Sequence, residues 1–213
     1  MLTLHQISKR YDDHILFQGL SRSFEPGCFA LSEEDSTGKT TLLSLIAGVV
    51  PPDEGDIIID GYSLAQAPEQ ALSRVVYIPE HCPASPTQTG RQWLEAMAKK
   101  HHASVNQSVM AFASQLGLDV HLDKPFEQMS TGTRRKMLWA AADIGQPAVM
   151  IADGPSNGLD TPGRQALAAQ LKIWANTRVI LLASYDHALL DACGAYRLQA
   201  ATLAPIKQQE QAG

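Results

Sequence analysis

The stretch "FALSEEDSTGKTTLLSLIAG", residues 29 to 48, predicts a strand, a loop and a helix in immediate succession. Its apolar beginning is typical of a buried strand, which we expect over residues 28–32. Apolar residues within 42–46 form one face of a helix, and Gly48 is placed to end that helix, with two prolines just beyond. This order of elements is the one that a phosphate-binding loop requires.

The residues that would contact a phosphate follow the loop directly: Gly38, Lys39, Thr40 and Thr41. Backbone N–H groups at a helix N-terminus converge on an anion, a lysine adds a mobile positive charge to the outer phosphates, and the adjacent hydroxyl holds Mg²⁺. Lys39 and Thr40 fit those last two roles. A Gly-Lys-Thr tripeptide also arises by chance at an ordinary helix start, so the tripeptide alone leaves both interpretations open.

Three consecutive acids, Glu33, Glu34 and Asp35, stand in the loop itself, where a triphosphate would lie. Two unit charges about 4 Å apart interact by roughly 1 kcal/mol in water and about 4 kcal/mol at an intermediate dielectric. One carboxylate close to the terminal phosphate could therefore reduce affinity tenfold or more. The alternative is that these side chains point to solvent.

Composition limits the classes of protein to consider. With 213 residues, 45% of them hydrophobic, the chain can bury a core, and its length predicts one compact unit or one with an inserted subdomain. A net charge of −5 and the absence of a basic block argue against nucleic acid as a ligand. The three cysteines follow no metal-ligand spacing and are interpreted as packing residues of a cytoplasmic protein. No signal sequence or long apolar run is present, so we expect any membrane-spanning segment to belong to another polypeptide.

Short apolar runs alternate with helical patterns along the chain, which predicts an α/β fold with a mostly parallel sheet. The alternating pattern near the start, LTLHQIS, predicts a small antiparallel layer beside that sheet. Strand patterns are absent from Thr89 to about Gln146, where helices are expected over 91–102, 104–117 and 133–143. Strands are expected over the following ranges: 28–32, 56–60, 74–79, 148–153 and 178–184.

Several motifs in this order resemble the ATP-binding subunits of ABC transporters, over nearly the whole chain. Lys39 lies 41 positions before Glu80, and Asp153 lies 32 positions before Tyr185, which are about the separations that the family uses. The motifs are Tyr11, the loop residues 38–41, YIPE ending at Glu80, Ser130-Thr131-Gly132, AVMIAD ending at Asp153, GPSNGLD (154–160) and LLASYD around Tyr185.

The resemblance implies one ABC-type domain over 1–213, with a P-loop NTPase core (1–80 and 147–213) and a helical insert (81–146). It further implies a head-to-tail dimer that encloses two ATP molecules, each on the phosphate loop of one subunit and the signature helix of the other. The implied roles are ATP binding by Gly38, Lys39, Thr40, Thr41, Ser130, Gly132 and Asp160, adenine stacking by Tyr11, and Mg²⁺ binding by Thr40, Glu80 and Asp153.

Two of these roles have alternatives. Without family context, an aromatic residue such as Tyr11 is an ordinary core residue, and an acid that ends a strand, such as Asp153, is a solvated turn residue. The implied partners are a membrane-spanning permease, docked around residues 81–95, and a second ATP-binding subunit. The implied location is the cytoplasmic face of the cell membrane.

The chain departs from the family where chemistry occurs. Gly154 stands where the family has a glutamate that polarises water, and glycine cannot act as a general base. Tyr185 replaces a histidine that contacts the terminal phosphate, and Glu80 replaces a glutamine. Thr131 and Thr133 replace a glycine and a glutamine of the signature.

Three hypotheses therefore stand after sequence analysis. The favoured one is a degenerate ATP-binding subunit with little or no hydrolysis of its own that supports a catalytic partner. The second is an active transporter ATPase, with water activated by Glu80 or by substrate phosphate. The third is a scaffold that binds no nucleotide and only docks a permease.

Overall fold

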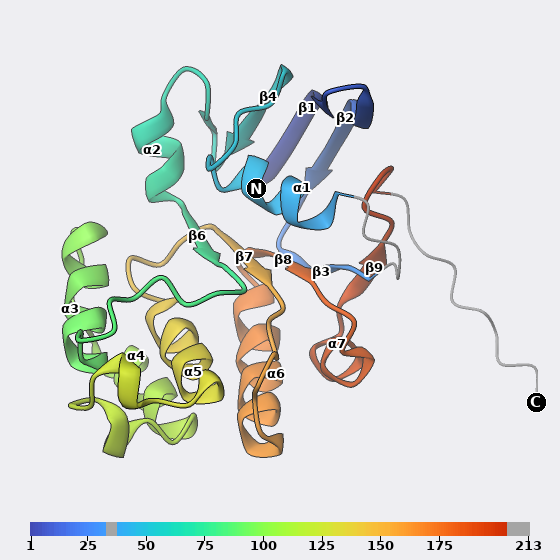
Figure 1. Cartoon of the computed structure of the whole chain (residues 1–213). Coiled ribbons are helices and arrows are strands. Elements are labelled where there is room, and N and C mark those ends of the chain that lie inside the picture. Colours follow the sequence, from blue (N-terminus) through green and yellow to red (C-terminus); the bar gives the residue numbers. More distant parts are fainter. Residues whose placement is uncertain (33–37, 204–213) are drawn as a thin grey trace, which may run out of the picture.

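The fold consists of two β-sheets with helices between them and below them (Figure 1). The computed structural model describes residues 1–32 and 38–203. The larger sheet is parallel, in the order β6-β7-β8-β3-β9. Its strands are β3 (Gly27–Leu31), β6 (Val75–Ile78), β7 (Val149–Asp153), β8 (Val179–Ala183) and β9 (Tyr196–Leu198).

The smaller sheet is antiparallel, in the order β2-β1-β4-β5. Both sheets agree with the α/β class and the antiparallel layer predicted from the sequence. The strand expected over 56–60 exists, but it pairs in this antiparallel layer rather than in the parallel sheet. The strands of the smaller, antiparallel sheet are β1 (Leu2–Tyr11), β2 (His14–Phe24), β4 (Glu54–Ile59) and β5 (Tyr62–Ser63).

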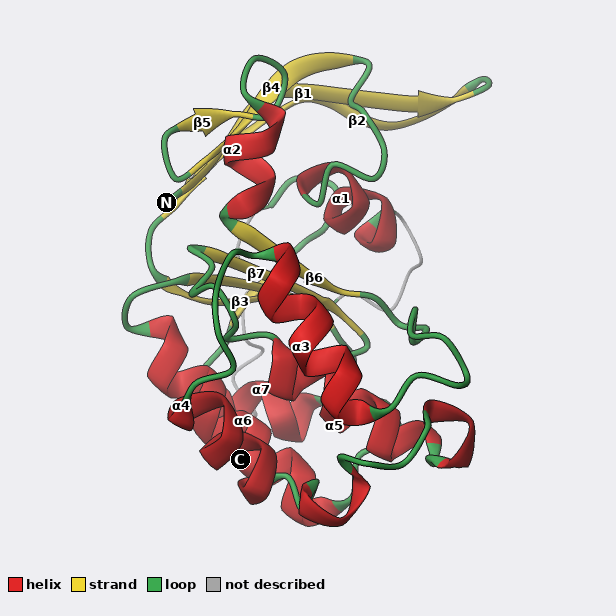
Figure 2. Ribbon diagram, turned by 90° about the vertical axis from the view of Figure 1, so that its left-hand side faces the viewer, coloured by secondary structure: helices red, strands yellow, loops and turns green. Residues whose placement is uncertain are grey.

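The central strands β7 and β8 are buried on both faces, which explains their nearly continuous apolar sequences. Successive side chains of a strand point to opposite faces. Ile180 and Leu182 accordingly pack into one core with the lower helices, whereas Val179 and Leu181 pack into a second core with α1 (Lys39–Ile46) and the antiparallel sheet. Figure 2 shows α1 between the two sheets, and in the chain this helix follows the carboxyl end of β3.

The remaining helices cover the lower face of the parallel sheet or flank it (Figures 1 and 2). Between β6 and β7 the structure has helices and no strand, as the sequence predicts, with one isolated β-bridge between Thr89 and Pro125. The exact division at residues 80 and 147 stays a prediction. The helices are α2 (Pro68–Ser73), α3 (Gly90–Lys100), α4 (Gln107–Gln115), α5 (Thr131–Ala141), α6 (Thr161–Ala175) and α7 (His187–Cys193), with short 3-10 turns at Asp119–His121 and Phe126–Gln128.

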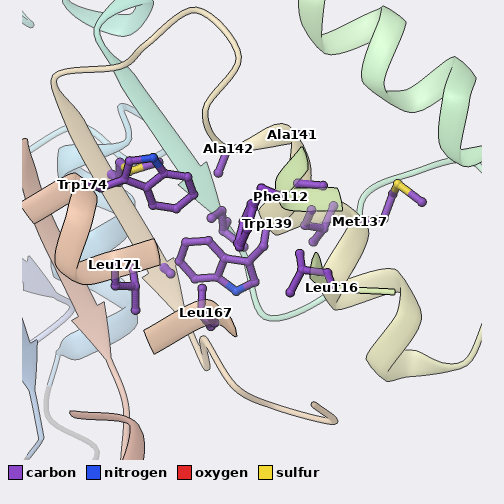
Figure 3. Packing of buried hydrophobic residues seen from close by; sticks show 14 of the residues in the cluster. Phe112, Leu116, Met137, Trp139, Ala141, Ala142, Leu167, Leu171 and Trp174 are labelled. Atoms are coloured by element: carbon purple, nitrogen blue, oxygen red, sulfur yellow. The ribbon is translucent and has the colours of Figure 1, made fainter. Parts of the chain in front are cut away.

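Aromatic residues join the helical region to the rest of the core. Trp139 of α5 stacks on Trp174 of α6 with ring centroids 6.3 Å apart, and Phe112 of α4 meets Trp174 edge to face (Figure 3). The Trp139 indole N–H donates a hydrogen bond to the Pro155 carbonyl at 2.9 Å. This contact ties α5 to the loop that follows β7, and both segments belong to the candidate site.

Two other sequence predictions can be compared with the structure. Cys28 and Cys193 are buried, with their sulfur atoms 3.8 Å apart, and both pack in the core as expected. Among the described residues, no helix combines the length and the apolar character needed to cross a membrane.

Candidate nucleotide-binding site

The site begins where β3 ends and α1 starts. Gly38 has a φ of +87°, a left-handed conformation that glycine adopts without strain. A side chain there would also collide with Phe17, because a Cβ atom would lie 2.7 Å from its ring. The backbone N–H groups of the first turn of α1 have no partner within the helix, so they can bind an anion, and no acid lies in that turn.

Lys39 is buried and held by Tyr185. Its ammonium group donates a hydrogen bond to the Tyr185 hydroxyl at 2.5 Å and lies 4.2 Å from the centre of the same ring. The two residues are 146 positions apart in the chain, and the sequence gives no sign that they meet. The fold brings them together because Tyr185 follows β8, the neighbour of β3 in the sheet.

Thr40 and Asp153 meet as a magnesium site would require. The Thr40 hydroxyl donates a hydrogen bond to the Asp153 carboxylate at 2.7 Å. Two oxygen ligands from a hydroxyl and a carboxylate fit Mg²⁺, which in nucleotide sites completes its octahedron with phosphate and water oxygens. Burial, reinforced by the charge of Asp153, raises the pKa of the neighbouring Tyr77. The magnesium roles of Thr40, Asp153 and Glu80 stay predictions.

Asn157 occupies the space beside Gly154. Its side-chain amide donates a hydrogen bond to the Glu80 carboxylate at 3.1 Å. A Cβ atom built on Gly154 would lie 2.3 Å from the Asn157 amide nitrogen, and Gly154 has a left-handed φ of +56°. A glutamate cannot enter this position unless Asn157 moves. Sequence analysis missed Asn157, although it lies within the GPSNGLD motif.

These side chains surround one cavity of about 360 Å³. Most of the residues predicted to bind phosphate or metal line this cavity. Four residues that were not predicted also line it: Asn157, Ala183, Ser184 and Asp186. The predicted residues that line it are Gly38, Lys39, Thr40, Thr41, Glu80, Asp153, Gly154 and Tyr185.

The signature residues lie outside this cavity, at the start of α5. The Ser130 side chain caps α5 by accepting a hydrogen bond from the Thr133 N–H at 3.1 Å. Gly132 allows a close approach to the next loop, because a Cβ there would be 2.1 Å from the Gly158 carbonyl oxygen. That these residues receive a partner's nucleotide stays a prediction.

Asp160 caps α6 and pairs with the signature helix. It accepts a hydrogen bond from the Gly163 N–H at 3.0 Å and forms an ion pair with Lys136 of α5 at 2.8 Å. The hydrogen bond from Lys136 holds the pKa of the Asp160 carboxyl below its usual range. Its predicted role at a dimer interface is not tested by these contacts.

Arg135 joins the signature helix to the segment that carries Glu80. This arginine is buried, and its guanidinium donates hydrogen bonds to the carbonyls of Pro79 and Glu80, both at 2.7 Å. Burial lowers the pKa of Arg135, while the charges of Glu80 and Asp153 act in the opposite direction. The sequence offered no signal for this anchor beyond a basic residue on a helix.

Tyr11 lies at the end of β1, with about half of its surface exposed. It is not among the residues that line the cavity, and Lys9 lies 5.4 Å from the centre of its ring. Adenine stacking by Tyr11 therefore stays a prediction. The acids Glu33, Glu34 and Asp35 lie outside the described residues.

A helix N-terminus with a buried lysine, opposite a strand-end aspartate paired with a threonine, defines a P-loop nucleotide-binding domain. The model of the family described as "ABC transporter" matches residues 25–157. The chain belongs to the ABC transporter family, as an ATP-binding cassette.

Curated relatives cover the chain at moderate identity. The Nod factor export ATP-binding protein I of Burkholderia pseudomallei is 29% identical over 86% of this chain and 62% of its own length. The linearmycin resistance ATP-binding protein LnrL of Bacillus subtilis is 27% identical over 81% of this chain and 57% of its own length. This chain thus spans about three fifths of the length of these relatives.

Solved structures share the fold. One titled as the ATP-binding subunit of an ABC transporter has a TM-score of 0.86 at 24% identity, covering 95% of this chain and 88% of its own. A second, the ATP-binding cassette MJ0796 as a post-hydrolysis dimer with ADP and Pi, has a TM-score of 0.79 at 16% identity, covering 98% and 100%. These likenesses agree with the predicted fold class.

Proposed function

We propose that this chain is a degenerate ATP-binding subunit of an ABC transporter complex, which binds Mg-ATP weakly, hydrolyses it poorly and supports a catalytic partner. The observation that carries the proposal is the environment of Gly154. The residue has no side chain to activate water, and the Asn157 amide lies where the Cβ atom of a side chain at this position would be. A missing general base reduces the rate of a proton-transfer step by about 10²- to 10⁴-fold.

Glu80 is the nearest candidate for a substitute base. Its carboxylate accepts a hydrogen bond from Asn157, and its backbone carbonyl is held by Arg135. The Glu80 side chain is exposed and lines the cavity, and the Asn157 amide engages one of its two carboxylate oxygens. Within this proposal we assign Glu80 a supporting role.

The signature side of the chain supports the role of a helper subunit. Ser130 still caps α5, Gly132 still allows the close approach to Gly158, and Asp160 still caps α6. A partner with an intact phosphate loop and glutamate could therefore use this surface to complete one working site. The supporting subunit then contributes a signature helix rather than chemistry.

The test is ATP hydrolysis by the purified chain, alone and mixed with an ABC ATP-binding subunit whose phosphate loop and catalytic glutamate are intact. We expect the chain alone to turn over about a hundredfold more slowly than the mixture, because only the mixture contains a general base. Phosphate release measured at millimolar Mg-ATP gives both rates. A chain that alone reaches the rate of the mixture is an active ATPase, and a chain that binds no Mg-ATP at millimolar concentration is a scaffold.

An apolar groove of about 520 Å³ gives the proposed permease a place to dock. It lies between the end of α1, α2, β6 and α3, and the segment 81–95 predicted for docking contributes Pro83 and Trp93. Val49 and Leu72 line it with exposed side chains, which is the apolar surface that a partner helix would cover.

Charged substitutions in this groove should release the permease. Val49→Asp and Leu72→Asp are expected to reduce copurification of the chain with a co-expressed permease at least about tenfold, because each buries a carboxylate at the contact. Ile173→Asp is the control, since Ile173 is an aliphatic residue on α6 that is 61% exposed, close to the 65% of Val49. Equal retention of all three variants would exclude this docking surface. Circular dichroism confirms that each variant is folded.

A further inference from the structure

We infer that Tyr185 sets the nucleotide preference of the pocket, so that the site binds a nucleoside diphosphate at least as tightly as a triphosphate. The inference rests on the proposed binding of nucleotide at Lys39. The inference goes beyond that proposal, because it assigns to Tyr185 the preference between a nucleoside diphosphate and a nucleoside triphosphate.

The contacts of Lys39 are the first step. The Tyr185 hydroxyl lies 2.5 Å from the ammonium nitrogen, and the centre of the ring lies 4.2 Å from it. One side chain therefore supplies a hydrogen-bond acceptor and an aromatic face to the same cation. Lys39 is only 8% exposed, whereas Tyr185 is 52% exposed and lines the cavity. The ring thus covers the ammonium group on its solvent side.

The second step compares the phosphates. Helix N–H groups cradle the inner phosphates, whereas the loop lysine reaches the outer ones. The backbone N–H groups of the first turn of α1 do not depend on the Lys39 ammonium group, so they can hold the inner phosphates of a diphosphate while Tyr185 covers that group. An ammonium group has three donors, and Tyr185 uses one of them. A terminal phosphate that approaches the ammonium group from its solvent side must displace the ring that covers it.

The charge of the cavity acts in the same direction. Lys39 is the only cationic side chain among the described residues that line it, whereas Glu80 and Asp153 also line it. Asp186, a third acid of the lining, is paired with Arg164 at 3.6 Å. Magnesium, which Glu80 and Asp153 would help to hold, accompanies either ligand, so the extra negative charge of a triphosphate falls to Lys39, the one cation among the described lining residues. The free-energy cost of displacing Tyr185 from Lys39 is therefore not offset by another positive side chain among the described lining residues.

The experiment is calorimetric titration of the full chain and its variants with two probes, Mg-ADP and the magnesium complex of an ATP analogue whose outer bridge is non-cleavable nitrogen. We expect the wild type to bind Mg-ADP at least as tightly as the analogue. Tyr185→Ala should strengthen analogue binding about tenfold and Mg-ADP binding less than about threefold. Tyr185→Phe keeps the ring and loses the acceptor, so the gain for the analogue should be about threefold.

Tyr196→Ala is the matched control, because Tyr196 is an exposed tyrosine on β9 that does not line the cavity. It should leave both affinities unchanged. If nucleotide binds and Lys39→Ala weakens it, but Tyr185→Ala leaves the ratio of the two affinities unchanged, the inference is wrong and the proposed nucleotide binding stands. If neither probe binds any of these proteins at millimolar concentration, the proposed function fails and the inference fails with it.

Discussion

Replacing Gly154 with glutamate and Asn157 with glycine in the same chain should raise ATP hydrolysis about a hundredfold. The glutamate supplies a carboxylate next to Asp153, where a general base contributes about 10²- to 10⁴-fold to a rate. The second substitution removes the amide nitrogen that a Cβ at position 154 would meet at 2.3 Å. We expect the lower end of that range, because residue 154 keeps a left-handed φ of +56°, which strains a glutamate.

The single variants isolate the role of Asn157. Gly154→Glu alone should raise hydrolysis less than the double variant and lower the melting temperature, because the glutamate must displace the Asn157 amide and adopt a left-handed φ of +56°. Asn157→Gly alone should also stay near the wild-type rate, since it adds no base. Phosphate release and thermal unfolding of the three variants measure these outcomes. A rate for Gly154→Glu equal to that of the double variant would show that Asn157 does not block the position.

Lys39→Ala should weaken Mg-ATP binding about a hundredfold. The substitution removes the only cation among the described residues that line the cavity, and charge-assisted contacts with phosphate are about twice as strong as neutral hydrogen bonds. Lys172→Ala, an exposed lysine on α6, is the control and should change nothing. Titration with Mg-ATP gives the affinities. Thermal unfolding separates a loss of binding from a loss of folding, because Lys39 is buried.

Removing negative charge from the loop, with the same titration, tests whether the loop acids weaken Mg-ATP binding. Glu33→Gln, Glu34→Gln and Asp35→Asn together should tighten Mg-ATP binding about tenfold, because one carboxylate near the terminal phosphate costs about that much. An unchanged affinity would mean that these side chains face water. If the Lys39→Ala variant binds Mg-ATP as tightly as the wild type does, phosphate does not bind at this loop.

The elements that depend on local pattern were predictable from the sequence. The strand ending near Leu31, the helix from Lys39 and the buried runs of β7 and β8 are short, strongly apolar and bounded by turn residues, so periodicity and turn signals located them. Strand β2, strand β9 and helix α6 were not predicted. Strand β2 and helix α6 mix polar and apolar residues with internal glycines, and β9 is only three residues long.

The contacts inside the site depend on residues distant in the chain. Asn157 was missed because its importance lies in its distance from Gly154 and Glu80, and no spacing in the sequence encodes that distance. Arg135 resembles any basic residue of a helix until the fold places it against Pro79 and Glu80. The contact between Lys39 and Tyr185 could not be predicted from the sequence either, because only the pairing of β3 with β8 brings the two residues together.

The sequence by itself determined the family resemblance, the order of strand, loop and helix around Lys39, and the absence of a glutamate at position 154. These properties belong to residue identity and local spacing, which a chain carries whether or not it is folded. The tertiary structure alone decided that Asn157 fills the vacant position and that Tyr185 covers Lys39. Both depend on distances between side chains that only the packing of the parallel sheet against its helices establishes.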